Sequence, residues 1–415
     1  MSISEMKRVP EEAEKKEEDP AVSRFRDYLR IRSEHPNPDY GSIKKFLNGV
    51  AKFLDLPIME VEVKPGRWVS VLTWKGQNPE LKSILLNSHT DVVPVIQEQW
   101  HYDPFEAVKD SEGNIYARGA QDMKCVGMQY VEAIRRLKDD GKTFPRTVYM
   151  SFVPDEEIGG ILGMAEFVQR DEFKALNLGF ALDEGLANPE EEMKAYYGER
   201  IVCWLKVKCP GNTGHGSRFV ENTAAGKLQK VINSLLGFRE SEKAKLEKNG
   251  MNLGDVTTVN LTMLQGGIQV NVVPSEFTAN FDIRVTPSTD IQEFEEQIKM
   301  WCKDAGDDVT YEIEKTPKAQ LTSTSPSDPW WKAFSSACVE KGVKLQVEIF
   351  MGATDSRYLR KLGYPAIGFS PMNHTPVLLH ENDEFLNERV FLRGIDIYAA
   401  IIPALASVPP FPGEG

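Results

Sequence analysis

The sequence predicts an α/β protein in which one domain is inserted into another. Helical and strand-like hydrophobic patterns alternate over residues 20–198, which is typical of a layered α/β domain. Residues 199–317 instead follow the order β-α-β-β-α-β, the order of a ferredoxin-like unit, with its first helix expected over 223–239. Residues with metal-binding side chains occur on both sides of that region. The first domain is therefore expected to be discontinuous, made of 20–198 and 318–415 after a tail at 1–19.

Composition excludes several classes of protein. A chain of 415 residues is longer than one core usually spans, and its net charge of −13 without a basic cluster argues against a nucleic-acid partner. No apolar run approaches the roughly 20 residues that cross a bilayer, so no membrane partner is expected. Five scattered cysteines without CxxC spacing favour the reducing cytoplasm. Residues 1–19 are rich in Glu and Lys and are expected to form a solvated tail.

The elements of the first domain follow from helix signals and hydrophobic spacing. Asp19 followed by Pro20 is typical of a helix N-terminus, because the carboxylate caps the helix and proline fits its first turn. The patterns predict, in order, helices over 22–29 and 43–54, strands over 59–63, 69–74 and 84–86, a helix over 126–137, and strands over 147–153 and 179–182. The run Ile84–Leu86 is apolar throughout, which favours a parallel strand buried on both faces.

Residues with metal-binding side chains follow these strands. His89 and Asp91 come soon after Ile84–Leu86, and in an extended chain their side chains leave the same face. The others are Asp122 before the helix at 126–137, Glu156 and Glu157 after 147–153, Glu184 after 179–182, and His380 before the last helix. Because sites in open α/β sheets form outside the carboxyl ends of strands, we expect these side chains to meet. A mixture of histidine and carboxylate suits zinc, with manganese or cobalt as alternatives.

Each of these features also has an ordinary explanation. A histidine two residues from an aspartate is most often a hydrogen-bonded loop residue, and Asp122 alone would be a helix N-cap. An acidic loop is usually solvated surface, but Asp155–Glu157 follows an apolar strand. Three adjacent acids there are costly unless a cation offsets their repulsion. The interpretation as a metal site therefore depends on the whole set of residues.

Four motifs resemble, in order and spacing, those of the dinuclear-zinc family of aminoacylases, carboxypeptidases and dipeptidases. They are Ser88-His89-Thr90-Asp91, Gly119-Ala120-Gln121-Asp122-Met123-Lys124, Pro154-Asp155-Glu156-Glu157 and Leu182-Asp183-Glu184-Gly185. The resemblance extends from about Pro20 to near the C-terminus. It implies a zinc-peptidase-like α/β/α catalytic domain whose inserted domain serves as a lid and in dimerisation.

The resemblance also implies a role for each motif residue. Two zinc ions would be held by two sets of ligands that share one carboxylate: His89, Asp122 and Glu184, and Asp122, Glu157 and His380. Asp91 would orient His89, and Glu156, which is not a ligand, would be the general base. The peptide bond between Asp122 and Met123 is expected to be cis.

Two residues of the inserted domain are expected to act in the site of a partner subunit. His215 lies in the glycine-rich segment Gly211–Ser217, and Asn271 lies in the segment Gly266–Pro274. Without the resemblance these segments would be a surface loop and a hairpin turn. The resemblance implies a homodimer across which both residues reach the substrate, and we expect His215 to stabilise the oxyanion.

Further residues are candidates for substrate binding. Arg357 lies shortly after Gly352 and suits a bidentate grip on a carboxylate, although an ordinary surface arginine is the alternative. The resemblance makes Arg357 the clamp for the substrate α-carboxylate. Arg284 is a weaker candidate because Asp282 could simply pair with it. The remaining histidines are expected to be structural or exposed: His35, His101 and His374.

The resemblance implies that the chain hydrolyses the amide bond of N-acyl-L-amino acids, with N-acetyl amino acids as expected substrates. A dipeptidase or carboxypeptidase of the same family is the alternative with the same chemistry. A metal-free binding protein that kept the fold is the alternative of a different class. That alternative predicts lost ligands, whereas every expected ligand and the Glu156 base are present.

Overall fold

The computed structural model describes residues 18–414, so residues 1–17 of the predicted tail lie outside the described part of the chain. The protein divides into two compact units. Unit 1 holds the described residues up to Tyr197, together with Thr322–Val347 and the residues from Thr354 onward, and unit 2 holds Gly198–Leu321 and Glu348–Ala353. Residues 348–353 were predicted to belong to the first domain, as part of 318–415, but they lie in unit 2.

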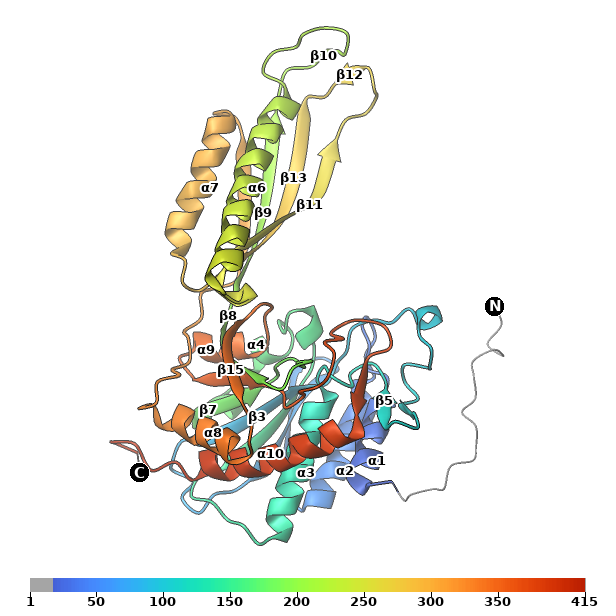
Figure 1. The fold of residues 1–415 in the computed structure, drawn as a ribbon, viewed down its shortest axis with the longest axis vertical. Coiled ribbons are helices and arrows are strands. Elements are labelled where there is room, and N and C mark those ends of the chain that lie inside the picture. The colour runs from blue at the N-terminus through green and yellow to red at the C-terminus, as the bar shows by residue number, and fades with distance from the viewer. Residues whose placement is uncertain (1–17, 415) are drawn as a thin grey trace. The chain divides into compact units, whose positions relative to one another are not determined.

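Unit 1 is organised around an eight-stranded mixed sheet (Figure 1). Its strand order is β1 (Ile58–Lys64), β2 (Arg67–Trp74), β6 (Val148–Val153), β3 (Ser83–His89), β7 (Leu178–Asp183), β16 (Ala366–Phe369), β8 (Met193–Glu199) and β15 (Leu345–Phe350). β3 is buried along its whole length and runs parallel to both of its neighbours, β6 and β7. This confirms the prediction from its unbroken apolar run.

Both faces of this sheet are covered by helices. Alternate residues of each strand point to opposite faces, so neighbouring residues of one strand pack into different hydrophobic clusters. Ile84 and Leu86 belong to one hydrophobic cluster, whereas Leu85 belongs to another on the opposite face. The first cluster is completed by α1 (Pro20–Leu29), α2 (Tyr40–Leu54), α3 (Lys124–Asp139), α8 (Pro329–Glu340) and α10 (Glu388–Ala406). The second is completed by α4 (Met164–Phe167), α5 (Asp171–Lys174) and α9 (Ser356–Lys361). Unit 1 is therefore an α/β/α sandwich, and the predicted α/β class is confirmed.

Several local signals of unit 1 act as expected. The Asp19 carboxylate accepts a hydrogen bond from the Ala21 backbone N–H at the start of α1, and Pro20 occupies the first turn. A small second sheet, β17-β5-β4, joins Phe385–Asn387 to Asn114–Tyr116 and Val108–Lys109. This sheet brings the chain after His380 beside the chain before Asp122.

Unit 2 is a four-stranded antiparallel sheet in the order β11-β13-β9-β14, with two helices against one face (Figure 1). In chain order its elements are β9 (Ile201–Pro210), β10 (Gly214–His215), α6 (Ala224–Asn249), β11 (Thr258–Gly266), β12 (Val272–Val273), β13 (Glu276–Val285), α7 (Ile291–Ala305) and β14 (Thr310–Lys315). Inward residues of β9 alternate with outward ones, as its sequence predicts. β10 and β12 pair as a short ribbon at one end of the unit (Figure 1).

One helix is longer than predicted. α6 begins after its Thr223 cap but continues to Asn249, ten residues past Arg239, where the apolar stripe weakens. The added turns are rich in Glu, Lys and Ala, which favour helix without an apolar pattern. Among the described residues, no helix is long and apolar enough to cross a membrane.

Candidate metal centre

The first group of candidate ligands forms at the end of β3. His89 is 1% exposed, and its Nδ1 lies 2.9 Å from the backbone oxygen of Asp91. Because a carbonyl oxygen only accepts, Nδ1 carries a hydrogen and Nε2 is left to face the site. Nε2 lies 2.8 Å from Oδ1 of Asp122 and 3.5 Å from Oε2 of Glu184. We call this group the closed half of the site: His89, Asp122 and Glu184.

The second group uses the other oxygen of the same aspartate. His380 Nε2 lies 3.4 Å from Oδ2 of Asp122 and 3.1 Å from Oε2 of Glu157. Within the described residues, the buried Oε1 of Glu157 has no hydrogen-bond partner. The side chain of His380 is 50% exposed, so we call Asp122, Glu157 and His380 the open half. Asp122 thus stands between the halves, and its bond to Met123 is cis, as the resemblance implied.

The electrostatics of the five side chains show why a cation fits among them. Burial raises the pKa of Glu184 well above its usual value, and burial with the charge of Asp122 raises the pKa of Glu157 to about 7. Burial alone would also raise the pKa of Asp122, but hydrogen bonds from His380 and His89 hold it below its usual value.

The histidines respond in the opposite direction. Hydrogen bonds to Asp122 and Glu157 raise the pKa of His380 to about 10. Burial opposes the charge on His89, yet Glu184 and Asp122 raise its pKa well above the usual value. In each half, one imidazole nitrogen faces two carboxylates within 4.8 Å, where a divalent ion would replace its proton. The donors therefore fit two metal ions that share Asp122.

Asp91 does not orient His89 in the predicted way. Its carboxylate oxygen lies 3.8 Å from Nδ1 of His89, and the backbone carbonyl makes that contact instead. The carboxylate accepts hydrogen bonds from the backbone N–H groups of Glu156 at 3.2 Å and Glu157 at 3.1 Å. These donors begin the 3₁₀ turn η3 (Glu156–Ile158), and the first N–H groups of a helical turn lack partners within it. Asp91 therefore links the chain after β3 to the chain after β6.

Glu156 is buried beside the candidate ligand Glu157 on the same turn. Burial raises its pKa well above the usual value, and the nearby charges of Asp355 and Glu157 act in the same direction. A carboxyl with a raised pKa can hold a proton between two chemical steps at neutral pH. This environment suits the predicted general base.

Glu384 is a buried acid that was not predicted to belong to the site. Glu384 accepts backbone hydrogen bonds from Gly119 at 3.1 Å, Gln121 at 2.6 Å and Asp122 at 3.3 Å. It also accepts from Arg118 at 2.8 Å, and Arg118 donates in turn to the backbone oxygen of His380 at 3.3 Å. Glu384 therefore joins the segment that carries Asp122 to the loop that carries His380. In the sequence it belongs to the acidic run Glu381–Glu384, which looks like solvated surface.

The candidate substrate residues of unit 1 and its neighbouring segment have clear contacts. Nη2 of Arg357, in α9, donates to the backbone oxygen of Gly159 at 2.6 Å, directly after the turn that carries Glu156. A side chain on Gly352 would lie 2.9 Å from the ring of Phe350, which is a packing reason for glycine there. The role of Arg357 as a carboxylate clamp stays a prediction.

In unit 2, His215 and Asn271 come together on the β10–β12 ribbon. His215 pairs with Val272, the residue after Asn271, and its exposed ring lies 2.8 Å from the hydroxyl of Ser217. Arg284 donates two hydrogen bonds to Asp282, at 2.7 and 3.0 Å, which is the pairing that the sequence left open. The structure therefore adds no support for Arg284 as a substrate-binding residue.

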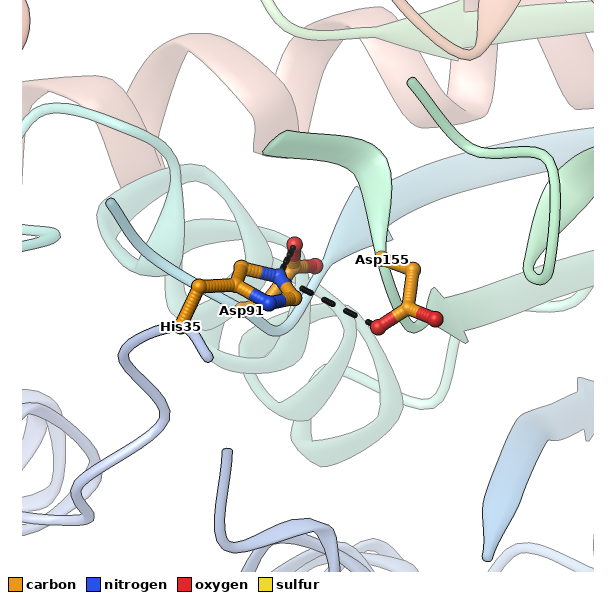
Figure 2. Close-up of side chains that lie close together, drawn as sticks. All are labelled: His35, Asp91 and Asp155. Carbon is orange, nitrogen blue, oxygen red and sulfur yellow. Dashed lines mark hydrogen bonds and ion pairs between the residues drawn. The ribbon is translucent and has the colours of Figure 1, made fainter. Parts of the chain in front are cut away.

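The remaining histidines divide into two kinds. His101 and His374 are exposed, as expected, and His101 pairs with Asp383. His35 is buried and bonded to Asp91, so it is structural in the sense predicted but lies against the site (Figure 2).

An α/β/α sheet with two donor groups sharing a carboxylate beyond its strand ends is the arrangement of a dinuclear metallohydrolase. Residues 85–404 match the profile of peptidase family M20/M25/M40. Aminoacylase-1 of Sus scrofa is 58% identical over 96% of this chain and 98% of its own length. Aminoacylase-1 of Dictyostelium discoideum is 45% identical over 94% of this chain and 99% of its own.

Solved structures agree on the fold. An M20 metallo-carboxypeptidase from Sulfolobus solfataricus has a TM-score of 0.73 at 18% identity, over 94% of this chain and 100% of that one. A dinuclear metal-binding M20 peptidase from Bacillus subtilis has a TM-score of 0.69 at 17% identity, over 94% and 98%. The chain belongs to peptidase family M20/M25/M40, and it is a metal-dependent hydrolase.

Proposed function

We propose that the chain hydrolyses the amide bond of N-acyl-L-amino acids, releasing a carboxylate and a free L-amino acid. The observation that carries this proposal is near-full-length identity of 58% with an aminoacylase, combined with both donor groups in the site. N-acetyl amino acids are the substrates we expect first.

The residues of the site have separate tasks in this reaction. When bound, the metal pair supplies Lewis-acid activation of water and of the substrate carbonyl. Glu156 takes a proton as the water attacks the acyl carbon, and returns it to the nitrogen of the leaving amino acid. Its buried position keeps the proton available at neutral pH, and Asp91 holds the turn on which it lies.

Specificity for a free amino-acid carboxylate is assigned to Arg357. The position of its guanidinium beside Gly159, next to the turn of Glu156, supports this role. A guanidinium can bind a carboxylate through two parallel hydrogen bonds, which an ester or amide cannot match. An N-acyl amino acid would therefore fit better than an internal peptide bond.

A hydrolysis screen tests the substrate class. It compares acetyl, longer acyl and dipeptide forms of Met, Leu, Glu, Gln and Asp by release of the free amino acid. Acetylated amino acids should be cleaved with the highest kcat/KM. A preference for dipeptides with a free amino group would instead identify the dipeptidase or carboxypeptidase alternative.

We assign the metals as two zinc ions per chain, bound by the closed and open halves. One imidazole and two carboxylates in each half suit zinc, while manganese and cobalt are the substitutes that such ligands also accept. Metal analysis of protein purified without added metal tests this assignment. Recovery of activity after chelation should be greatest with zinc, and a clear advantage for manganese would change the assignment.

We also propose that the active protein is a homodimer in which His215 and Asn271 complete the site of the partner subunit. The exposed ribbon on which these residues lie together supports the proposal. The four-stranded antiparallel sheet of unit 2 also has an edge strand, β11, that could pair with a second copy.

Mixing two inactive variants tests the shared site. Glu156→Gln and His215→Ala are refolded together, and random pairing in a two-fold dimer gives about half heterodimers. One site in each heterodimer then has both an intact Glu156 and an intact His215, so activity should return to roughly a quarter of wild type. Confirmed heterodimers without activity would show that His215 acts within its own chain.

The protein is assigned to the cytoplasm. All five cysteines lie within the described residues, and each is a buried free thiol: Cys125, Cys203, Cys209, Cys302 and Cys338. Unpaired thiols are typical of a reducing compartment. Imaging of the tagged protein tests this assignment.

A further inference from the structure

A third group of metal-binding side chains lies beside the site: His35, Asp91 and Asp155. His35 Nε2 is 2.9 Å from Oδ2 of Asp91 and 3.9 Å from Oδ1 of Asp155 (Figure 2). All three side chains are buried. Their composition is that of a metal site, so their other hydrogen bonds decide what they do.

These hydrogen bonds occupy every carboxylate oxygen of the group. Oδ1 of Asp91 accepts from the Glu156 N–H, and its Oδ2 accepts from both the Glu157 N–H and His35. The two oxygens of Asp155 accept from the Tyr40 hydroxyl, at 2.6 Å, and from Nε of Arg67. A guanidinium already neutralises this aspartate, and a cation there would have to displace these donors. The group is therefore a hydrogen-bonded cluster in which every carboxylate oxygen already has a donor.

The position of His35 is itself fixed by the backbone. Its N–H donates to the Val92 oxygen at 3.2 Å, and the Val92 N–H donates to the Ser33 oxygen at 3.0 Å. The segment after α1 thus lies along the chain that follows His89. Because a carboxylate only accepts, His35 donates its Nε2 hydrogen to Asp91.

We propose that His35 is a positioning residue for Glu156 and Glu157. It holds the Asp91 carboxylate in the orientation in which both oxygens bind the backbone of η3. That turn carries the general base and one ligand of the open half, while the backbone oxygen of Asp91 fixes His89 in the closed half. His35 therefore keeps the base aligned with both halves, an inference that rests on the proposed role of Glu156.

Two variants of His35 separate the effect of losing the hydrogen bond to Asp91 from the effect of losing the imidazole ring. The amide nitrogen of glutamine can occupy the place of imidazole Nε2, whereas asparagine is one methylene shorter and does not reach Asp91. We expect His35→Asn to lower kcat roughly 10–100-fold, because small misplacement of a base is costly, with KM within about twofold. His35→Gln should stay within about threefold of wild type in kcat. His374→Asn is the matched control and should be unchanged, because His374 is exposed and its backbone N–H donates to the Glu190 oxygen rather than to a member of the cluster.

Hydrogen exchange tests whether the cluster holds the turn in place, and it does not require catalytic turnover. In zinc-loaded full-length protein, hydrogen exchange at the Glu156 and Glu157 amides should be about tenfold faster in His35→Asn and near wild type in His35→Gln. Zinc content should be equal in all three proteins. If His35→Asn does not fold, His35→Met, which has no hydrogen to donate, takes its place.

Three results would overturn the proposal. Wild-type kcat and wild-type exchange in both the Asn and the Gln variant would show that the hydrogen bond positions nothing. Equal impairment of both would assign His35 a packing role. A third zinc ion in the wild type that is lost with His35 would make the cluster a metal site. Wild-type protein that is inactive on every N-acyl amino acid would refute the proposed function instead, and the exchange measurement would still test the cluster.

Discussion

The two halves of the site are built from the same ligand types but from different structural elements. His89 ends a central strand that is buried along its whole length, is 1% exposed and has its Nδ1 fixed by the backbone of Asp91. His380 is 50% exposed and lies in a loop, with a left-handed φ of 62°. Its backbone is joined to Asp122 through Arg118 and Glu384.

The sheet therefore preorganises the closed half, whereas side-chain hydrogen bonds organise the open half. A strand buried on both faces cannot move without disrupting the core, whereas a half-exposed loop can open at smaller cost. We therefore expect the closed half to bind its metal more tightly and to contribute more to stability. The open half should exchange its metal faster.

The largest expected effect comes from a residue that belongs to neither half. Glu156→Gln removes proton transfer, so kcat should fall by roughly 10²–10⁴-fold while both metal ions stay bound. Steady-state kinetics with N-acetyl-methionine and metal analysis check this expectation. Glu157→Gln is the adjacent control and should lose metal from the open half. Metal loss in the Glu156 variant would reverse the two roles.

Replacing each histidine tests the comparison directly. After chelation of metal, His89→Ala should lower the free energy of unfolding by about 3 kcal/mol, because it leaves buried Asp122 and Glu184 without their cationic partner. His380→Ala should cost less than about 1 kcal/mol, because its side chain is half exposed. Urea unfolding measures both values. Equal losses would show that the two halves do not differ in rigidity.

Glu384→Gln weakens the support of the open half. The glutamine amide would present N–H groups to donors that now meet a carboxylate, so unfolding free energy should fall by about 2 kcal/mol. Metal release from the open half, followed with a chelating dye, should accelerate more than release from the closed half. Glu381→Gln, at an exposed acid in the same run, should leave both quantities unchanged. Uniform acceleration at both halves would mean that Glu384 supports the whole site.

The smallest effect is expected from replacing Arg357, a candidate substrate-binding residue that belongs to neither half of the site. Arg357→Ala should raise KM for N-acetyl-methionine about tenfold and remove discrimination against the methyl ester. Metal content should not change. Preserved discrimination in the variant would exclude Arg357 as the carboxylate clamp.

Local patterns were sufficient to predict much of this protein. Asp19 and Pro20 begin α1 because capping depends on neighbouring residues, and the apolar run Ile84–Leu86 is a buried parallel strand because its environment is apolar on both sides. Helix ends were harder to predict. α6 continues past Arg239 because Glu, Lys and Ala sustain a helix without a core-facing stripe.

By itself, the sequence determined the α/β class, the strands and the residue types that could hold a metal, because hydrophobic period and side-chain chemistry are local properties. Only the tertiary structure decided which partner each side chain takes. It turned the Asp91 carboxylate toward Glu156, Glu157 and His35 rather than His89. It also buried Glu384, from an apparently solvated run, against the backbone of Asp122. These contacts join segments far apart in the chain, and a buried carboxylate takes whichever donors the packed fold brings within reach.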